Sequence, residues 1–356
     1  MASTSQGPGV SQHLAFFPVY GLNISKDVGG ELTIGRVTFV DANRIDRIHK
    51  RLGFPNPVSF YRNKSYIKNL FKQAPVYACL KSLRAKSSRD FDKEYKAVTE
   101  AFWLLASSFF YETDRDRVTI SLAPHAAFST FDDISVFDRA SDAHFMHYRR
   151  RGMVVPQSLD RDWKRISRHH FFPYVKQITN GTREVKSKLW KDSILRAATL
   201  CGQSLLARHV AEAFFNNMVA IETLLTKRGD KFPDALVNRL AALFGWMTGE
   251  EIEPWQDLIG RLYKLRCSYV HDGIRGDITG MDLFDADTLV TNLLINLGRN
   301  TSSITSKEDL LRLADNCSAR RTLGIRAKRP KTLTYQKRYL SNSQLERIND
   351  LSRWSW

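Results

Sequence analysis

The chain has 356 residues, of which 43% are hydrophobic and 26% are charged. This is the composition of an ordinary globular protein, and the length is enough for two domains that each bury a core. The formal net charge of +17 at pH 7 favours a polyanionic partner, and nucleic acid rather than a membrane, because no basic amphipathic anchor is evident. The alternative is a solvated surface whose charge only keeps the protein soluble.

Other features exclude several classes of protein. The four cysteines include no Cys-x-x-Cys pair, so we expect neither a zinc site nor a disulfide framework. The longest apolar run, residues 101–111, is too short to span a bilayer, and the first residues lack the basic and apolar regions of a signal peptide. We therefore expect a cytoplasmic protein that uses no metal or other cofactor.

The N-terminal part of the chain has the pattern of short strands. Residues 1–12 are small, polar and glycine-rich, which predicts a disordered lead. Strands are expected over 14–20, over 31–40 with a break at Gly35, and over 74–83. In these stretches apolar residues cluster or alternate with polar ones between glycines and prolines.

A change of period marks a helix in the same part of the chain. Over 90–111 apolar residues recur every three or four positions, which predicts a helix with one strongly apolar face. The pattern over 118–122 returns to a strand. Residues 13–125 are therefore predicted to form an α+β module in which an antiparallel β-sheet packs on one long helix.

Residues 126–182 mix basic and aromatic side chains and include the run Arg149, Arg150 and Arg151. Such a pattern is typical of single-stranded nucleic acid binding, in which bases stack on rings beside a basic surface. An equal alternative is a connector between two domains, with arginine stems covering apolar surface. The histidine pairs of this stretch lack a carboxylate or cysteine at ligand spacing, so no metal site is predicted.

Helical periodicity dominates residues 183–316 and predicts an all-α antiparallel bundle, because the connections between its helices are short. A capping pattern, Ser306-x-x-Asp309, opens a last short helix that is expected to end near 316. The helices before it are expected over 189–198, 205–227, 232–245, 253–272 and 283–297.

Residues 317–356 form a basic tail. From Ser318 on it carries ten basic residues, Lys337 and Arg338 among them, against two acidic ones, a net charge of +8. As a nucleic-acid arm it would bind through phosphates and depend strongly on salt. The alternative is that its aromatic end folds back onto the N-terminal module. The residues of connector and tail predicted to contact nucleic acid are Arg149, Arg150, Arg151, Arg320, Arg321, Lys328, Arg329 and Lys331.

The helix expected over 253–272 carries Arg266 and, five positions later, His271. The spacing alone is uninformative, because Arg-x4-His occurs at four places in this arginine-rich chain. Only this match lies at the end of a long apolar-periodic segment, with Pro254 in its first turn and Gly273 after its last. Arg266 falls on the edge of the apolar stripe, so we expect its guanidinium to have an anionic partner.

These residues resemble the Apea-like branch of the HEPN superfamily. The resemblance rests on two stretches. One is a Leu-Tyr-x-Leu-Arg run that leads into a histidine and a turn, and the other is the earlier Ala220-Ile-Glu-Thr-Leu-Leu. The resemblance covers roughly 185–300, so the bundle is expected to be of HEPN type. The N-terminal Phe-Pro-Val-Tyr-Gly-Leu is loosely similar to the region that often precedes such domains.

The resemblance implies a metal-independent endoribonuclease in which two motif helices meet across a homodimer. RNA supplies its own nucleophile, the 2′-hydroxyl, so His271 can act as general acid or base while Arg266 stabilises charge on the phosphorane. A two-fold axis would double both groups into one cationic cleft. The residues predicted to support this pair are Glu222, Tyr263, Ser268 and Asp272.

Glu222 is expected either to pair with an arginine of the bundle or to lie solvated on its helix. The candidate partners are Arg208, Arg239 and Arg266. If Glu222 is buried, removing its partner should damage the fold as well as any activity.

Two positions depart from the family's pattern. Cys267 follows the motif arginine, where catalytically competent members usually have a small amide or acid, and Gly273 stands where the version paired with nucleotidyltransferase antitoxins has a tyrosine. A second hypothesis is therefore a non-catalytic protein that dimerises through the bundle and binds nucleic acid. A third is an adaptor within a phage-defence system whose N-terminal module recognises another protein. The ribonuclease hypothesis places the chain in a defence or toxin context, with a phage or cellular trigger recognised by the N-terminal module.

Overall fold

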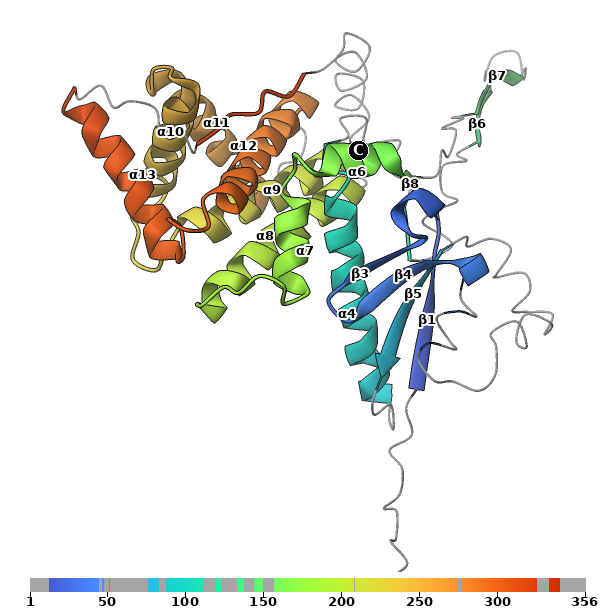
Figure 1. Ribbon diagram of the computed structural model, residues 1–356. Helices are drawn as coiled ribbons and strands as arrows, with labels where there is room; N and C mark the ends of the chain where they lie inside the picture. Colours follow the sequence, from blue (N-terminus) through green and yellow to red (C-terminus); the bar gives the residue numbers. More distant parts are fainter. Residues whose placement is uncertain are drawn as a thin grey trace, which may run out of the picture. The chain divides into compact units, whose positions relative to one another are not determined.

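Figure 1 shows the computed structural model of the chain. It describes residues 13–44, 47, 51, 76–82, 88–111, 120–122, 133–137, 144–149, 157–207, 209–273, 277–324 and 333–339. The chain forms two compact units, Met1–Phe102 with Asp116–Arg165, and Trp103–Arg115 with Ile166–Trp356. Several predictions fall outside the described residues: the lead 1–12, the start of the strand over 118–122, and the roles of Arg150, Arg151, Arg208, Lys328, Arg329 and Lys331.

The first unit contains a four-stranded antiparallel sheet with the order β1-β5-β4-β3. Its strands are β1 (His13–Val19), β3 (Glu31–Ile34), β4 (Val37–Asp41) and β5 (Val76–Ser82). Alternation explains the hairpin of β3 and β4, since Leu32, Ile34, Val37 and Phe39 are all buried. Gly35 takes the positive φ of 60° that the turn between these strands needs.

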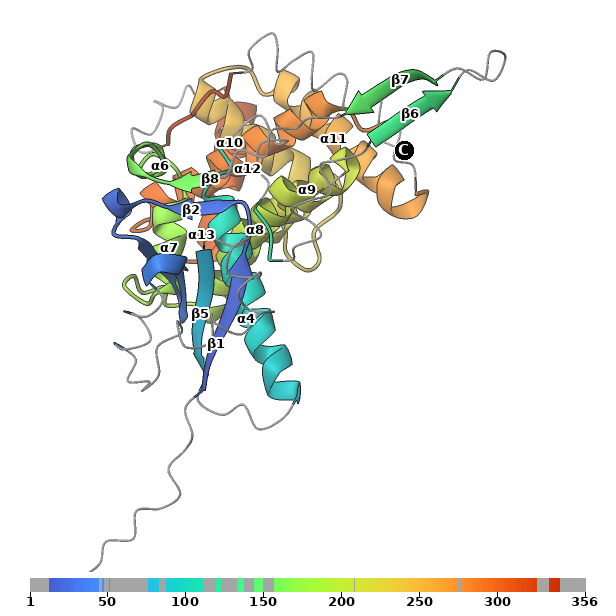
Figure 2. The same ribbon diagram turned by 90° about the vertical axis from the view of Figure 1, so that its right-hand side faces the viewer.

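One face of this sheet is covered by α4 (Ser88–Ser107), as Figures 1 and 2 show. The helix buries Val98 and Phe102. Its Tyr95 ring lies 6.0 Å from that of Phe17 on β1. The predicted α+β arrangement, an antiparallel sheet followed by helices, is confirmed. The last turn of α4, from Trp103, belongs to the second unit.

Smaller elements complete the first unit. A parallel pair joins β2 (Leu22–Ile24) to β8 (Gln157–Leu159), and an antiparallel hairpin joins β6 (Asp133–Phe137) to β7 (His144–Arg149). Two short 3-10 helices are η1 (Lys26–Val28) and η2 (Ala42–Arg44). Residues 126–182, predicted as one connector, are thus divided between the two units at residue 165.

The second unit is helical. Its elements are α6 (Arg161–Ser167, which begins in the first unit), α7 (Phe172–Thr179), α8 (Lys188–Leu206), α9 (Val210–Leu225), α10 (Asp234–Thr248), α11 (Glu253–His271), α12 (Gly280–Arg299) and α13 (Lys307–Thr322). The central one is α12, which buries fifteen of its twenty residues, including Leu289, Val290, Leu293 and Leu294. Its neighbours are α8 and α9.

Two helix ends show where the local sequence predicts a helix boundary and where it does not. The capping box predicted at Ser306 is present: the Asp309 N–H donates to Ser306 Oγ at 3.1 Å, and the Ser306 N–H to Asp309 Oδ2 at 3.1 Å. The helix predicted over 205–227 is wrong in extent, because Ala207 is extended at φ −67°, ψ 137° and separates α8 from α9. The apolar period continues across this break, so the pattern alone could not show it.

Candidate functional site

Helix α11 carries the Arg-x4-His pair and is weakly buried in its own chain. It packs against α9 and α10, yet only Ile259 and Leu262 of its nineteen residues are fully buried. The expected apolar stripe is therefore only partly covered. Val270, outside that stripe, is 44% exposed. Gly273 ends the helix with a positive φ of 67°.

Arg266 pairs with Glu222 of α9 in the same chain. Its Nη2 donates a hydrogen bond of 2.9 Å to Glu222 Oε2, and its Nε lies 2.8 Å from Oε1. The two side chains are only 19% and 15% exposed. Burial raises the pKa of Glu222, and Arg266 offsets this only in part. The anionic partner expected for Arg266 is thus Glu222, which forms a largely desolvated ion pair.

Aromatic rings surround this ion pair. The Arg266 guanidinium carbon lies 5.8 Å from the centre of the Phe215 ring and 6.0 Å from that of Tyr263. Phe232 stacks on Tyr263 with ring centres 6.3 Å apart, and Tyr269 lies 5.4 Å from Phe215. These rings hold the guanidinium in place and shield it from water on several sides.

Tyr263 also lies beside Cys267. The pKa of the Tyr263 hydroxyl is raised, first by burial and then by a hydrogen bond with Cys267. Cys267 is a free, partly exposed thiol. The residue that departs from the family's pattern therefore faces the ring that packs over Arg266.

His271, Ser268 and Asp272 lie at the C-terminal end of α11. His271 and Asp272 are exposed, and Ser268 is half-buried, its carbonyl accepting from the Asp272 N–H at 3.0 Å. Five helical positions separate Arg266 from His271 by about 140° around the axis and about 7.5 Å along it. One copy of α11 therefore does not bring the guanidinium and the imidazole together on one face.

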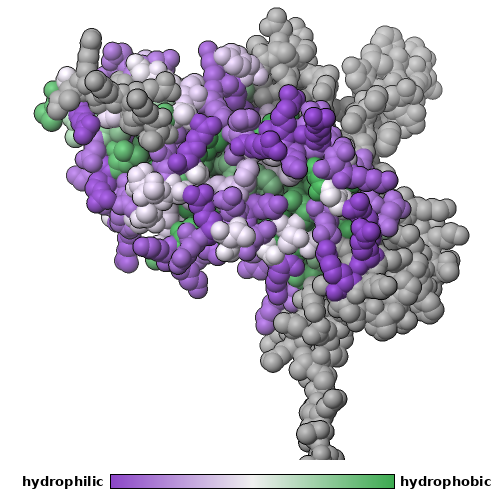
Figure 3. All heavy atoms as spheres, viewed as in Figure 1, coloured by the Kyte–Doolittle hydropathy of each residue, from purple (hydrophilic) through white to green (hydrophobic). Residues whose placement is uncertain are grey.

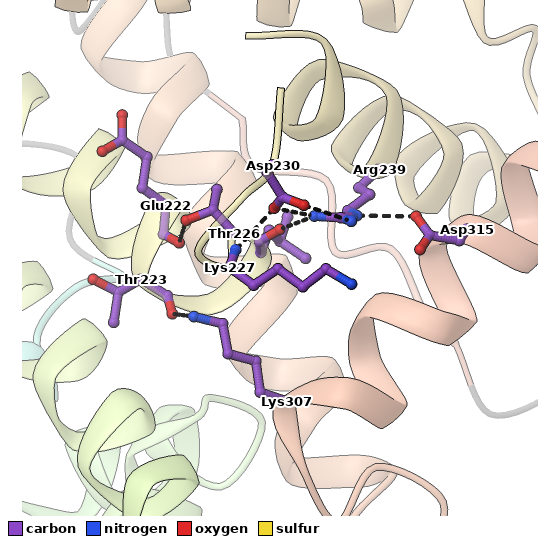
Figure 4. A network of polar contacts seen from close by, with 9 residues as sticks. Glu222, Thr223, Thr226, Lys227, Asp230, Arg239, Lys307 and Asp315 are labelled. Atoms are coloured by element: carbon purple, nitrogen blue, oxygen red, sulfur yellow. Dashed lines mark hydrogen bonds and ion pairs between the residues drawn. The ribbon is translucent and has the colours of Figure 1, made fainter. Parts of the chain in front are cut away.

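A second polar network holds the loop that follows α9, and Figure 4 shows it. Arg239 of α10 donates to Asp230 Oδ2 at 2.6 Å and Oδ1 at 3.2 Å, to the Leu225 carbonyl at 3.0 Å, and to Asp315 at 2.9 Å. Arg239, a candidate partner of Glu222, therefore pairs elsewhere, and Glu222 points away from it in Figure 4.

This network matters to the candidate site because it anchors the loop that carries Phe232. The Lys227 N–H donates to Asp230 Oδ2 at 2.8 Å, and the hydrogen bond from Arg239 holds the pKa of Asp230 below its usual range. Lys307 of α13 donates to the Thr223 carbonyl at 2.8 Å. The end of α9 and the loop after it are thereby fixed from two sides.

The residues predicted to bind nucleic acid are only partly described. Arg149 ends β7 and Arg321 lies in α13, but the side chains of both fall outside the description. Arg320 is exposed on α13, with its guanidinium 5.8 Å from the Trp246 ring. Arg338, counted among the tail's free charges, instead forms a buried ion pair with Asp287.

The tail over 317–356 was expected either to be a nucleic-acid arm or to fold its aromatic end back onto the N-terminal module. One described part of it, residues 333–339, packs along α12 of the helical unit, where Asn292 and Asn296 bind its main chain. The aromatic end of the tail lies outside the described residues. Sequence reasoning missed Asn292 and Asn296. The available signal was polar asparagines four positions apart on the apolar helix 283–297, which are costly to bury unless they bind something.

Comparison of the chain with protein-family models, with curated proteins and with solved structures gave no match. The described residues contain no cluster of three or more side chains able to hold a metal ion. None of the helices described is long and apolar enough to cross a membrane. On the face drawn in Figure 3 hydrophilic residues predominate, with hydrophobic ones visible only in small areas between them.

Proposed function

We propose that the chain is a metal-independent endoribonuclease of HEPN type. The observation that carries the proposal is the end of α11, where Arg266 is held rigidly by Glu222 and two aromatic rings while His271 stands exposed. The net charge of +17 supports a polyanionic substrate. Arg266 still has N–H groups on Nη1 that Glu222 does not engage, and these can donate to a phosphate oxygen.

The proposed reaction is an attack of the RNA 2′-hydroxyl on the adjacent phosphorus. A new O–P bond forms, the bond to the 5′-oxygen breaks, and the products are a 2′,3′-cyclic phosphate and a 5′-hydroxyl. His271 accepts the proton of the nucleophile or gives one to the leaving oxygen, because an imidazole nitrogen can act as general base or general acid. Arg266 stabilises the negative charge that develops on the phosphorane.

The proposed enzyme is a homodimer in which two copies of α11 meet about a two-fold axis. The weak burial of α11 supports this, because a helix with two fully buried residues in its own chain has surface left for a partner. A dimer also supplies what a single α11 lacks, since the Arg266 of one copy can face the His271 of the other. Recognition of a phage or cellular trigger by the N-terminal module belongs to the same proposal.

A second candidate is a non-catalytic protein that dimerises through the bundle and binds nucleic acid. The Arg266–Glu222 pair favours it, because a carboxylate 2.8 Å from the guanidinium neutralises the charge that a phosphate would need. In that case Arg266 is structural, and binding depends on the basic residues of the connector and the tail.

Cleavage of single-stranded RNA in EDTA separates the two candidates. We expect the purified protein to cut RNA but not DNA of the same sequence, and to leave 2′,3′-cyclic phosphate ends. His271→Ala should lower the cleavage rate by at least about 100-fold, as loss of a general acid or base does, while RNA retention at low salt stays the same. His209→Ala, at the exposed start of α9, is the matched control and should cut normally. RNA retention by all three proteins without cleavage by any would leave only the binding candidate.

The ion pair can be tested apart from activity by a double-mutant cycle of Arg266→Met and Glu222→Gln. Each change alone is expected to lower the free energy of unfolding by about 1–3 kcal/mol, because it leaves a desolvated charged or polar group without its partner. The double variant should lose less than the sum of the two. Lys264→Met, exposed on the same helix, is the control and should stay within about 0.5 kcal/mol. Additive losses from Arg266→Met and Glu222→Gln would show that the pair contributes nothing.

A further inference from the structure

The strap, residues 333–339, is an extended segment that lies along α12, the helix at the centre of the second unit; Figure 1 shows it in red beside that helix. It forms no helix or strand, and Leu333 at its start is 3% exposed. Extended backbone of this kind must find partners for its N–H and C=O groups outside regular secondary structure. For Thr334 and Gln336 these partners are side chains of α12.

Two asparagines of α12 bind the strap's main chain in the same way. The Thr334 N–H donates to Asn296 Oδ1 at 2.9 Å, and Asn296 Nδ2 donates to the Thr334 carbonyl at 2.8 Å. The Gln336 N–H donates to Asn292 Oδ1 at 2.7 Å, and Asn292 Nδ2 donates to the Gln336 carbonyl at 3.1 Å. The side-chain amide of each asparagine therefore binds both the N–H and the C=O of one strap residue, as the main chain of a neighbouring strand would.

The spacing of the two asparagines matches an extended peptide. Positions four apart on a helix are separated by about 6.0 Å along its axis, and alternate residues of an extended chain by about 6.6 Å. Asn292 and Asn296 thus meet Gln336 and Thr334 in register, with the strap running antiparallel to α12. These hydrogen bonds go to the main chain, so they do not depend on which side chains the peptide carries.

Side chains of the strap supply the specificity. Tyr335 packs edge-on against Phe244 of α10 and Trp255 of α11, with ring centres 6.1 and 6.2 Å away. Arg338 is 9% exposed, lies 3.5 Å from Asp287 and donates to the Phe110 carbonyl at 3.0 Å. The strap therefore has an aromatic anchor and, three residues later, a cationic anchor that pairs with the buried Asp287.

The residues that receive the strap carry both signs of charge: Arg299 of α12 donates to Thr334 Oγ1, and carboxylates lie nearby. Asp285 and Asp287 lie on α12, and Glu250 and Asp285 both raise the pKa of Tyr335, after burial, which is the larger cause. The strap itself carries Lys337 and Arg338 and no acidic residue. The ion pair of Arg338 with Asp287 favours this register of the strap.

The two asparagines also form hydrogen bonds within α12 that do not involve the strap. Asn292 Nδ2 also donates to the Thr288 carbonyl at 2.9 Å, and Asn296 Nδ2 to the Asn292 carbonyl at 2.8 Å. Without the strap both Nδ2 groups would keep an acceptor, whereas the two Oδ1 atoms would lose the N–H donors of Thr334 and Gln336, so only part of each asparagine's hydrogen bonding depends on the strap. Lys337 and Tyr339 are exposed, so the strap is bound along one side only.

We propose that this face of α12 is a peptide-binding site for extended basic segments with an aromatic residue and, three positions later, an arginine. Its occupant is the chain's own strap, which acts as a tethered and releasable ligand. Through Tyr335 and Trp255 the bound strap contacts the first turn of α11, the helix that carries Arg266 and His271. The proposal does not depend on ribonuclease activity.

Binding of a labelled peptide with the strap's sequence to the full-length chain tests the proposal. In a release variant, Gln336→Pro removes the N–H bound by Asn292, and Arg338→Glu reverses the buried charge. By fluorescence anisotropy this variant should bind the peptide at least tenfold more tightly than the unmodified chain, whose groove is filled. A peptide with Arg338→Ala should bind at least tenfold more weakly, and one with Lys337→Ala should bind as before. Lys337→Glu in the chain is the matched control and should behave as the unmodified chain.

Three results would overturn the proposal. The first is a release variant with unchanged helical circular dichroism that does not bind the peptide. The second comes from hydrogen exchange of the unmodified chain, which needs no substitution: the Thr334 and Gln336 amides should exchange at least tenfold faster than the core amides of α12, and equal protection would make the strap part of the core. The third is a dimer that Gln336→Pro dissolves, because the strap of one copy would then fill the groove of another.

Discussion

Replacing Arg239 with methionine is expected to lower the free energy of unfolding of the helical unit by about 3–5 kcal/mol. The guanidinium binds Asp230, Asp315 and the Leu225 carbonyl at once, and the Arg239 and Asp230 side chains are only 8% and 5% exposed. Without the cation, the Asp230 carboxylate stays buried, and among the described residues the Lys227 N–H is the hydrogen-bond donor that remains to it. Urea unfolding followed by circular dichroism at pH 7 measures the loss.

Two further variants show whether the buried carboxylate is the cause. Adding Asp230→Asn to Arg239→Met removes the unpaired charge and should recover part of the loss, because the two positions belong to one network. Arg312→Met is the matched control: Arg312 also pairs with an aspartate, Asp309, but its side chain is 71% exposed, so we expect less than about 1 kcal/mol. A loss in Arg239→Met as small as in Arg312→Met would contradict the role assigned to the network.

Acidification is expected to destabilise the protein through His170, by about 2 kcal/mol between pH 7 and pH 5. Both ring nitrogens of His170 are enclosed and have no hydrogen-bond partner among the described residues. Burial, and then the Arg338 charge, lower the pKa of His170 to about 3. The unfolded chain takes up a proton below about pH 6.5 while the folded chain does not, so stability is complete above that pH and falls as the pH drops.

A comparison of the unmodified chain with a variant that lacks His170 isolates the contribution of this residue to the pH dependence of stability. Asp285 contributes with the opposite sign in the same range, because burial raises its pKa to about 6 and the folded state then binds a proton more readily. We therefore compare the unmodified chain with His170→Leu, which should be less sensitive to acid by about 2 kcal/mol over this range. His169→Gln, an exposed neighbour, should keep the sensitivity of the unmodified chain. Equal pH dependence in the unmodified chain and His170→Leu would show that the imidazole is protonated in the folded state.

The sequence predicted those elements in which the spacing of apolar residues reflects a single buried face. The β3–β4 hairpin and helix α4 lie where alternation and the helical period placed them. The capping box at Ser306 was also predictable, because both of its residues are local. The break between α8 and α9, where Ala207 and His209 are both extended, was not predictable, since the apolar period continues across it.

The candidate site could be predicted only in part, because its partners are distant in sequence. From the sequence, Glu222 had three candidate arginine partners. Only the packing of α9 on α11 shows that its partner is Arg266. The burial of Arg338 was beyond the sequence pattern, since a basic residue in a basic tail looks the same whether solvated or paired. A count of charges shows that the chain has more cations than anions, but it does not show which cations form buried ion pairs.

The close approach of α8 to the end of α4 limits how the chain can be divided for expression. Gly202 of α8 lies so near the Trp103 carbonyl that a Cβ atom at residue 202 would be 1.9 Å from its oxygen. A few residues later Phe110, whose ring centre is 6.4 Å from that of Phe171, completes the same core. A fragment cloned from residue 166 would omit this piece and expose apolar surface, so the smallest autonomous helical fragment is not one continuous stretch of gene.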